Sequence, residues 1–342
     1  MNKSNKEFLD VVGRVHEIGK SWHANSLIEH ARDNKPFIAK SLKDLPAPAS
    51  AEKSKSAIVV SAGPSLHKFD VLQTLKAREY QGSIVAVDGS MIKCLKNGII
   101  PDYVLTLDPH PTRIVRWFGD HDFEKHSEED DYFSRQDLDI EFRNDTIREN
   151  LRNIELVNKY ASQIKLIICT SAPQNVRARA LEAGFDCYWW NPIVDDPSQP
   201  GSMTRELFSI NNLRCMNTGG TVGTAAWVFA NSILKVENIG ITGMDLGYHR
   251  ETPIENTQTF YELNAMCDTK EQLQAMFPSF VYPSTGVTYY TDPTYYWYRN
   301  NLLGLLKQAT SNTVNCSEAG ILFGDGVDCM PLTQFLENYC DG

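Results

Sequence analysis

A turn that can hold a phosphate group follows the first strongly apolar run of this sequence. The run covers residues 57–60, and the turn contains Gly63, Pro64 and Ser65. Glycine allows the backbone to approach a phosphate group closely, and Ser65 can cap the next helix or donate a hydrogen bond to a phosphate oxygen. The N-terminus of that helix adds a partial positive charge. The turn therefore predicts nucleotide binding. The alternative is an ordinary strand-to-helix turn, because the pattern is neither GxGxxG nor a P-loop.

Carboxylates follow the next two apolar runs. Asp88 ends one run and is followed by Gly89 and Ser90, and Asp108 ends the other. A carboxylate in the first position often accepts hydrogen bonds from ribose hydroxyls, so these three neighbours are predicted to bind the nucleotide. Asp108 can bind a divalent metal ion or act as a base. The alternatives are a helix cap at Asp88 and a local side-chain turn at Asp108 before Pro109.

A second glycine-rich segment opens a strongly apolar helix. It contains four predicted nucleotide-binding residues, namely Thr218, Gly219, Gly220 and Thr221. An apolar helix is expected to be buried, so its positive N-terminal end would point into the domain and favour a bound anion. The alternative is that the glycines only permit tight packing. Asp245 ends the next strand and His249 follows it, and both are catalytic candidates that can orient or deprotonate an acceptor hydroxyl.

The elements that must position these residues alternate between strands and helices. Apolar runs that suit buried strands cover residues 57–60, 83–87, 103–107, 165–169 and 236–242, with helical spacing between them. This alternation predicts an α/β protein with a Rossmann-like, mostly parallel sheet flanked by helices. Open α/β sheets bind ligands at the carboxyl ends of their strands, so we expect the site residues to gather at that edge.

Helical spacing followed by a proline-punctuated stretch predicts a helical N-terminal arm and linker at residues 1–55. The nucleotide-binding domain is then expected to cover residues 56–342, with insertions near 120–148 and 250–290. The first insertion contains a charge run at residues 126–131, which is typical of a solvated loop. The amphipathic arm is a candidate surface for contacts in a homo-oligomer.

Composition limits the partners and the compartment. The 342 residues carry a formal net charge of -10, which excludes a broad nucleic-acid-binding surface because phosphate neutralisation needs clustered Lys and Arg. The eight cysteines form no CxxC pair, as is typical of reduced thiols in a cytoplasmic protein. No apolar run is long enough for a membrane span, and the N-terminus does not resemble a signal peptide. We therefore expect a cytoplasmic protein.

Several segments resemble the MptE-like domain family, in the same order along the chain. They are residues 57–66, 87–90, 101–108, 219–226 through 243–246, and 315–320. This family includes archaeal 6-hydroxymethylpterin diphosphokinases and the motility-associated-factor glycosyltransferases that modify flagellin. The resemblance covers roughly residues 56 to 336. It implies a Rossmann-like domain that binds a nucleotide through the Gly63 turn and the Thr218 segment, with Asp88, Asp108 and Asp245 as site carboxylates.

A more distant likeness is to bacterial sialyltransferases of the Campylobacter type, which also carry Gly-Pro-Ser-Leu after the first strand. Those enzymes use a CMP-activated nonulosonic acid, so the likeness implies a CMP-sugar donor. They place a catalytic histidine before their last long helix, near residues 289–292 of this chain, where this sequence has none. His249, His110 or a tyrosine would have to take that role.

Three functions are compatible with these residues. The first is a glycosyltransferase that uses a nucleotide-activated sugar and a small-molecule, glycan or protein acceptor. In this function the two glycine segments hold phosphate, and Asp88 and Asp108 hold the ribose or the base. The second is a diphosphokinase that transfers pyrophosphate from ATP to a pterin-like alcohol, with Mg²⁺ held by Asp108 and Asp245. The third is a non-catalytic nucleotide-binding module. The insertions favour the first, and no tightly bound cofactor is expected.

Overall fold

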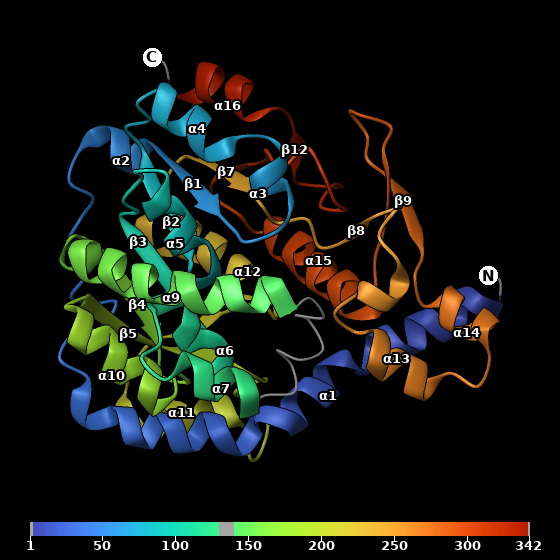
Figure 1. Ribbon diagram of the computed structural model, residues 1–342, viewed down its shortest axis with the longest axis horizontal. Coiled ribbons are helices and arrows are strands. Elements are labelled where there is room, and N and C mark those ends of the chain that lie inside the picture. The colour runs from blue at the N-terminus through green and yellow to red at the C-terminus, as the bar shows by residue number, and fades with distance from the viewer. Residues whose placement is uncertain (1–2, 130–139, 341–342) are drawn as a thin grey trace. The chain divides into compact units, whose positions relative to one another are not determined.

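The computed structural model describes residues 3–129 and 140–340, which form two compact units (Figure 1). Unit 1 contains Met1–Trp22, Ala51–Gly82 and Gly219–Gly342, and unit 2 contains His23–Ser50 and Ser83–Thr218. The long helix α1 (Lys3–Asn34) contributes its first part to unit 1 and its last part to unit 2.

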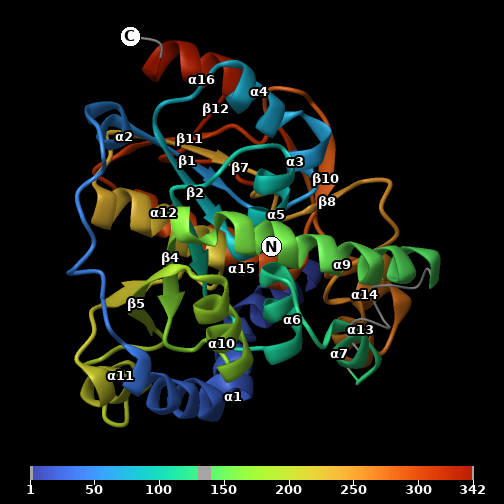
Figure 2. The same cartoon turned by 60° about the vertical axis from the view of Figure 1, so that its left-hand side comes forward.

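Unit 1 is built on four parallel strands in the order β12-β11-β7-β1. These strands are β1 (Ser56–Val60), β7 (Asn238–Thr242), β11 (Asn312–Asn315) and β12 (Asp328–Cys329). Its helices are α2 (Ala51–Lys55), α3 (Ser65–Lys68), α4 (Val71–Ala77), α12 (Val222–Val228) with the π-helical η4 (Phe229–Leu234), α15 (Pro293–Leu306) and α16 (Leu332–Tyr339). Helix α12 packs on β1, and α16 packs on β7 and lies beside α4 (Figures 1 and 2).

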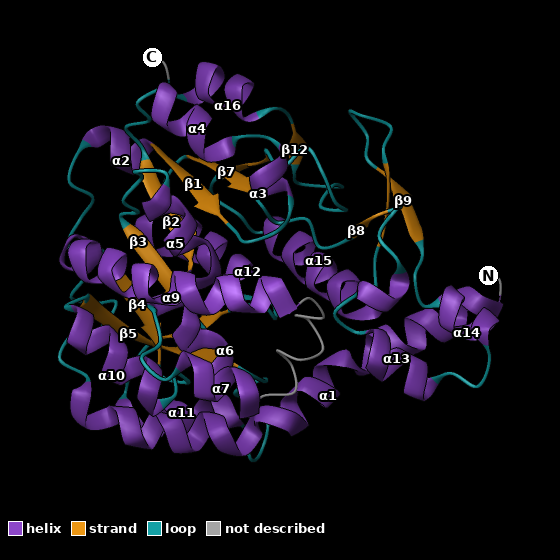
Figure 3. Ribbon diagram, viewed as in Figure 1, coloured by secondary structure: helices purple, strands orange, loops and turns teal. Residues whose placement is uncertain are grey.

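Unit 2 is built on five parallel strands in the order β2-β3-β4-β5-β6. These strands are β2 (Ser83–Val87), β3 (Tyr103–Thr106), β4 (Lys165–Cys169), β5 (Asp186–Ile193) and β6 (Cys215–Asn217). Its helices are η1 (Lys35–Phe37), α5 (Asp88–Lys96), α6 (Pro111–Val115), η2 (Arg116–Phe118), α7 (Phe123–Glu129), α9 (Ile140–Tyr160), η3 (Ala161–Gln163), α10 (Gln174–Ala183) and α11 (Met203–Asn211). Helix α5 packs on β2 and β3, and α9 packs on α5 (Figure 3).

The predicted α/β fold with a Rossmann-like, mostly parallel sheet flanked by helices is confirmed. All four apolar residues 57–60 of β1 are fully buried, as expected of a parallel strand covered on both faces. Helix α12 is buried from Gly223 to Val228, which agrees with its apolar sequence on every side. The large side chain of Trp227 in this helix donates a hydrogen bond from its indole Nε1 to Thr313 Oγ1 at 3.0 Å.

The stretch predicted as an insertion near residues 250–290 lies in unit 1. It contains η5 (Ile254–Asn256), α13 (Phe260–Met266), α14 (Lys270–Ala275) and an antiparallel sheet in the order β8-β10-β9, formed by β8 (Tyr248–His249), β9 (Ser279–Val281) and β10 (Thr288–Tyr290). Phe8 and Val12 of α1 pack in its apolar cluster with Leu263, Met276 and Phe277. The start of the predicted arm therefore completes the core of this insertion.

Most of the stretch predicted as a linker, up to Ser50, belongs to unit 2. Asn34 is fully buried, and its Nδ2 donates to the carbonyl oxygens of Thr170 (3.0 Å) and Ala172 (2.7 Å) after β4. Ser41 forms an isolated parallel β-bridge with Trp189 of β5. Of the other predicted insertion, near 120–148, residues 130–139 lie outside the described residues. Among the helices that the structure describes, none has both the length and the apolarity needed to cross a membrane.

Candidate functional site

The carboxyl ends of β1 and β7 bring the Gly63 turn to Asp245. Val60 pairs with Thr242 at the last position of the ladder, so the two following loops leave the sheet side by side. Asp245 Oδ2 accepts a hydrogen bond from the Ser65 backbone N–H at 2.8 Å, and Asp245 Oδ1 accepts one from the Ser65 hydroxyl. The carboxylate of the protein itself therefore occupies the donors at the start of α3 that the sequence suggested for a phosphate group.

Glycines make this close approach sterically feasible. The Gly63 N–H donates to the Gly243 carbonyl at 2.7 Å, and a Cβ atom on Gly63 would lie 2.5 Å from that oxygen and 3.0 Å from Asp245 Cγ. Gly320 has φ +80°, and a Cβ atom there would collide with the Asp245 backbone. Asp245 is thus enclosed by backbone on two sides, and any side chain at Gly63 or Gly320 would displace it.

Burial controls the ionisation of Asp245. The residue is only 7% exposed, and desolvation raises the pKa of its carboxyl group. The hydrogen bonds from Ser65 and the nearby charge of Lys68 oppose that rise in pKa. Both oxygens already accept protein hydrogen bonds, so the present geometry suits a group that fixes the Gly63 turn.

His249 lies in β8 and reaches the same neighbourhood through Tyr289. The His249 and Tyr289 rings meet in a T-shaped arrangement with their centroids 5.8 Å apart. Burial raises the pKa of Tyr289, and the charge of Asp245 raises it further. His249 Nδ1 accepts a hydrogen bond from the Glu251 backbone N–H at 3.4 Å. The structure therefore places a tyrosine, and not the histidine, next to Asp245.

The second glycine segment forms the entry to α12. Gly219 (φ +53°) and Gly220 (φ +95°) adopt left-handed backbone conformations, and a Cβ atom on Gly220 would lie 2.6 Å from the Tyr298 ring. Thr221 caps the helix, because its side chain accepts from the Thr224 N–H at 3.1 Å. Thr218, the last residue of unit 2 before this segment, is half-buried.

Two buried hydroxyl groups beside this helix start have no hydrogen-bond partner. They are Ser61 Oγ, just after β1, and Thr224 Oγ1 in the first turn of α12. A Cβ atom on Gly223 would lie 2.9 Å from Ser61 Oγ, which shows how closely the end of β1 approaches α12. Buried polar atoms are almost always hydrogen-bonded, so unpartnered ones need an explanation such as a bound ligand or water. The sequence did not single out these two residues, although both belong to its conspicuous segments.

In unit 2, Asp88 is a buried carboxylate with one unpartnered oxygen. Its Oδ1 accepts from the Gly89 N–H at 2.7 Å, while Oδ2 has no partner, and the neighbouring Ser90 hydroxyl donates to the Val87 carbonyl at 3.0 Å. Burial raises the pKa of Asp88 to about 7, against the opposing hydrogen bond from Gly89. Gly89 and Ser90 thus support the turn, and one buried oxygen of Asp88 has no hydrogen-bond partner among the described residues.

Other polar groups surround Asp88. The Thr106 hydroxyl, at the end of β3, lies close enough to Asp88 to favour the charged form of the Asp88 carboxyl group. Thr106 Oγ1 nevertheless makes no hydrogen bond of good geometry. The charge of Arg116 also favours ionisation, whereas the charge of Asp108 opposes it. Asp108 is exposed and accepts from the His110 N–H at 2.8 Å, which is the local turn considered as its alternative. Arg116 and Thr106 are neighbours of the site that the sequence did not reveal.

The predicted residues therefore form two clusters. Unit 1 brings together Gly63, Ser65 and Asp245 by direct contact, with the α12 entry packed on the end of β1, and unit 2 brings Asp108 near Asp88. Pro64 precedes α3 as its N-cap residue, without a side-chain cap. Among the described residues, no group of three or more His, Cys, Asp or Glu side chains is placed to hold a metal ion.

The packing around Gly63 predicts the effect of one added methyl group. We expect Gly63→Ala to destabilise the protein by about 1–3 kcal/mol, because the new Cβ atom would overlap a backbone oxygen that cannot move freely. Gly304→Ala is the matched control, since nothing lies within 4 Å of a Cβ atom there and the helical position gains about 0.5–1 kcal/mol. Urea unfolding measures both, and equal stability of the two variants would contradict this account.

The raised pKa of Asp88 predicts a pH dependence of stability. Its pKa is about 7 in the folded protein and about 3.9 in an unfolded chain, so between these values the folded state holds a proton that the unfolded state has released. Stability from this group therefore falls as the pH rises through that window. We expect Asp88→Asn to be more stable than the wild type at pH 8, with the difference vanishing near pH 4.

The control for this titration is Asp325→Asn, which changes an exposed carboxylate in unit 1. Thermal unfolding from pH 4 to pH 8 gives the comparison for all three proteins. A constant offset between wild type and Asp88→Asn at every pH would show that the buried carboxyl does not titrate in this range.

Comparisons with known proteins agree with the resemblance found in the sequence. Residues 29–124 match the model of a family described as 6-hydroxymethylpterin diphosphokinase MptE-like. No curated protein matches the chain. Among solved structures, the fold is similar to that of the MAf glycosyltransferase from Magnetospirillum magneticum AMB-1, with a TM-score of 0.55 and 18% sequence identity. The similarity covers 90% of this chain and 38% of the other, so this chain spans well under half of that protein. An MptE-like segment thus lies within a fold similar to that of a MAf glycosyltransferase.

Proposed function

We propose that this protein is a transferase that uses a nucleotide-activated sugar, and that its donor is a CMP-activated nonulosonic acid. The fold similarity to a MAf glycosyltransferase and the MptE-like segment support the general activity. The choice of CMP rests on the sequence likeness to sialyltransferases. The acceptor is a hydroxyl group of a small molecule, a glycan or a protein.

The observation that carries the proposal is the pair of unpartnered buried hydroxyls at the α12 entry, Ser61 and Thr224. An unsatisfied buried hydroxyl costs about 1–3 kcal/mol, which a phosphate oxygen of the donor would recover. The N-terminal end of the helix, which continues from α12 directly into η4, adds a favourable field for an anion. Thr221 and the glycine backbone complete a set of groups suited to phosphate.

In this mechanism the acceptor oxygen attacks the anomeric carbon while the bond from that carbon to the phosphate oxygen breaks. The electron pair of the broken bond leaves on the phosphate of CMP. Hydroxyl donors and the helix field stabilise that developing negative charge, which lowers the barrier without a covalent enzyme intermediate. Asp245 acts through Ser65 by fixing the Gly63 turn, and His249 is the candidate in unit 1 for orienting the acceptor.

Taken by itself, unit 2 is proposed to bind polar groups of a nucleotide through the Asp88 cluster. Asp88 Oδ2 can accept a hydrogen bond from a ribose hydroxyl or a base amino group, and Thr106 Oγ1 can donate or accept one. Gly89 and Ser90 hold the Asp88 turn in place, and Asp108 supplies an exposed carboxylate next to it.

The match to the MptE-like family favours a second candidate, an ATP-dependent diphosphokinase. That reaction needs Mg²⁺ to bridge the phosphates, and Asp108 and Asp245 are its proposed ligands. The described residues fit the ion poorly, since both Asp245 oxygens accept hydrogen bonds from Ser65 and no group of three ligating side chains is formed. We therefore derive no step through a metal ion.

A panel of nucleotides tests the proposal against its rivals. We expect CMP to raise the thermal unfolding midpoint of the full chain more than UDP, GDP or ATP, with and without Mg²⁺, because a ligand that binds only the folded state stabilises it. A response to ATP that requires Mg²⁺ would favour the diphosphokinase. No response to any nucleotide would contradict both enzymatic functions.

The hydroxyl of Thr224 gives a residue-level test of the phosphate site. Thr224→Val keeps the side-chain shape and removes the donor, so we expect CMP affinity to fall about tenfold, equivalent to about 1.4 kcal/mol. The unliganded variant should be at least as stable as the wild type, because the lost hydroxyl has no protein partner. Thr333→Val, on the exposed side of α16, is the control, and titration calorimetry measures all three. Unchanged CMP affinity in Thr224→Val would rule out this hydroxyl as a ligand.

A further inference from the structure

Two side chains near the buried Asp245 carboxyl group carry proton donors that the described residues do not use. The positive charge of Lys68, in α3, opposes the rise in the pKa of Asp245, so the two groups lie within electrostatic range. The charge of Asp245 likewise reaches Tyr289 in β10. Among the residues that the structure describes, neither the Lys68 ammonium group nor the Tyr289 hydroxyl group forms a hydrogen bond or an ion pair. All three residues belong to unit 1.

Strand β10 holds the Tyr289 ring in a nearly buried position, 5% exposed. Tyr289 pairs with His249 of β8 and with Phe280 of β9 in the antiparallel sheet. Its ring meets the His249 ring at a centroid distance of 5.8 Å and the Tyr282 ring at 6.5 Å, both in T-shaped arrangements. A buried tyrosine usually places its hydroxyl group on a hydrogen-bond partner, so the unused donor of Tyr289 is available to a ligand.

Contacts between β10 and the loop after β7 set the position of Tyr289. The Thr291 hydroxyl donates to the Leu246 carbonyl at 2.9 Å. Gly247 approaches the Tyr290 carbonyl so closely that a Cβ atom on the glycine would lie 2.9 Å from that oxygen. The phenol is therefore held by backbone contacts on both sides of its own position, which gives the rigid support that a binding site requires.

Lys68 lies on the solvent-exposed side of the Gly63 turn. It is exposed, as are Ala62 and Pro64 of the turn, so a dissolved ligand can reach it. Its ammonium group lies over the ring of the next residue, Phe69, 5.5 Å from the ring centroid. The turn therefore presents one positive charge that no carboxylate of the described residues neutralises by an ion pair.

This charge is the only one from a lysine or arginine in the segments around Asp245 and the α12 entry. Those segments are residues 61–70, 219–224, 243–249, 288–292 and 316–322. A ligand with a negative charge that binds among these segments of unit 1 would therefore find a full positive charge only at Lys68.

A cation and a phenol donor near one aspartate suit a ligand carboxylate. Such a group accepts hydrogen bonds at both oxygens, and hydrogen bonds between charged groups are the strong ones. The raised pKa keeps the Tyr289 hydroxyl protonated at neutral pH, so it acts as a donor. The negative charge of Asp245 opposes the binding of a second carboxylate, and the positive charge of Lys68 offsets that repulsion.

The proposed donor carries a carboxylate beside its phosphate. In a nonulosonic acid the anomeric carbon bears a carboxylate as well as the oxygen bonded to phosphate, whereas the anomeric carbon of an aldose bears a hydrogen atom instead. Ser61, whose hydroxyl is part of the proposed phosphate site, lies in the loop that leads from β1 to Lys68. Its carbonyl lies against Gly243, in the loop that leads from β7 to Asp245. The phosphate site and Lys68 therefore border the same two loops of unit 1.

We propose that Lys68 and Tyr289 form a carboxylate subsite that makes the enzyme select a nonulosonic acid as the donor sugar, an inference that rests on the proposed function. The Lys68 ammonium group pairs with the ligand carboxylate, and the Tyr289 hydroxyl group donates a hydrogen bond to one of its oxygens. Both residues act on donor binding and not on the bond that breaks. The subsite lies within unit 1 alone.

The test compares two ligands of the full chain that differ only in this charge, CMP-activated N-acetylneuraminic acid and its methyl ester. We expect the wild type to bind the acid about tenfold more tightly than the ester, because the ester cannot form an ion pair. Lys68→Gln and Tyr289→Phe should each bind the acid about tenfold more weakly, with the affinity for CMP unchanged. Titration calorimetry without an acceptor measures these affinities.

Lys307→Gln and Tyr339→Phe are the matched controls. They remove the same two chemical groups elsewhere in unit 1, at the exposed end of α15 and in α16, and should bind both ligands as the wild type does. Tyr289→Phe keeps the ring that contacts His249, and thermal unfolding shows that each variant still folds.

Equal affinity of the wild type for the acid and the ester would overturn the inference, and so would unchanged affinity for the acid in either Lys68→Gln or Tyr289→Phe. Binding of CMP by the wild type would in that case leave the proposed function standing. A wild-type protein that binds neither CMP nor the acid would contradict the proposed function, and this inference with it.

Discussion

The hydrogen bonds from Ser65 to Asp245 are the interaction on which the arrangement of unit 1 depends. They join the loops that follow β1 and β7, and they satisfy the backbone and side-chain donors at the start of α3. Burial raises the pKa of Asp245, and the hydrogen bonds from Ser65 oppose that rise. Ser65 can reach the carboxyl group because Gly63 and Gly320 carry no side chain. The two glycines, the start of α3 and the Asp245 carboxyl group therefore depend on one another.

This pairing moves the proposed phosphate site away from the first turn. With the Ser65 donors engaged, the groups without partners are Ser61 Oγ and Thr224 Oγ1 at the entry to α12. Their location next to the end of β1 keeps the ligand at the edge of the sheet expected for an open α/β fold. In the proposed function, the first glycine turn supports the site and the second glycine segment binds the phosphate group.

Three buried carboxylates show how the surroundings separate structural from chemical roles. Asp245 has both oxygens bonded to one serine, Asp120 has both oxygens bonded and points one at a histidine, and Asp88 keeps one oxygen unpartnered. A saturated carboxylate positions its neighbours, a carboxylate facing a histidine sets a tautomer, and an unsaturated one is available to a ligand. Burial alone does not distinguish these roles, since all three residues are less than 8% exposed.

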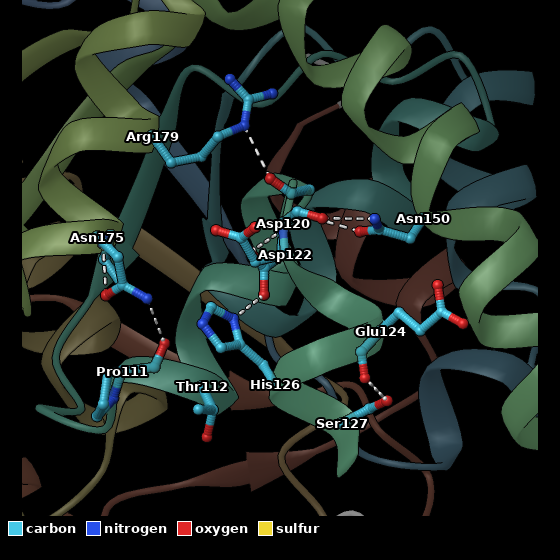
Figure 4. Close-up of polar contacts among 12 residues, drawn as sticks. Pro111, Thr112, Asp120, Asp122, Glu124, His126, Ser127, Asn150, Asn175 and Arg179 are labelled. Carbon is cyan, nitrogen blue, oxygen red and sulfur yellow. Dashed lines mark hydrogen bonds and ion pairs between the residues drawn. The ribbon is translucent and has the colours of Figure 1, made fainter. Parts of the chain in front are cut away.

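The sequence by itself determined the elements and the class of fold, because apolar strands and amphipathic helices are local patterns. It also located the Gly63 and Gly219 turns and the carboxylates Asp88 and Asp245, since glycine and acidic residues at strand ends are visible without a structure. Only the tertiary structure decided the partners, because Ser65 and Asp245 are 180 positions apart and Asp120 depends on Asn150, 30 positions away. The same reason hid the contact between His126 and Asp120: the charged neighbours of His126 in the sequence indicate solvent, whereas the structure places its Nδ1 2.6 Å from a buried carboxylate (Figure 4).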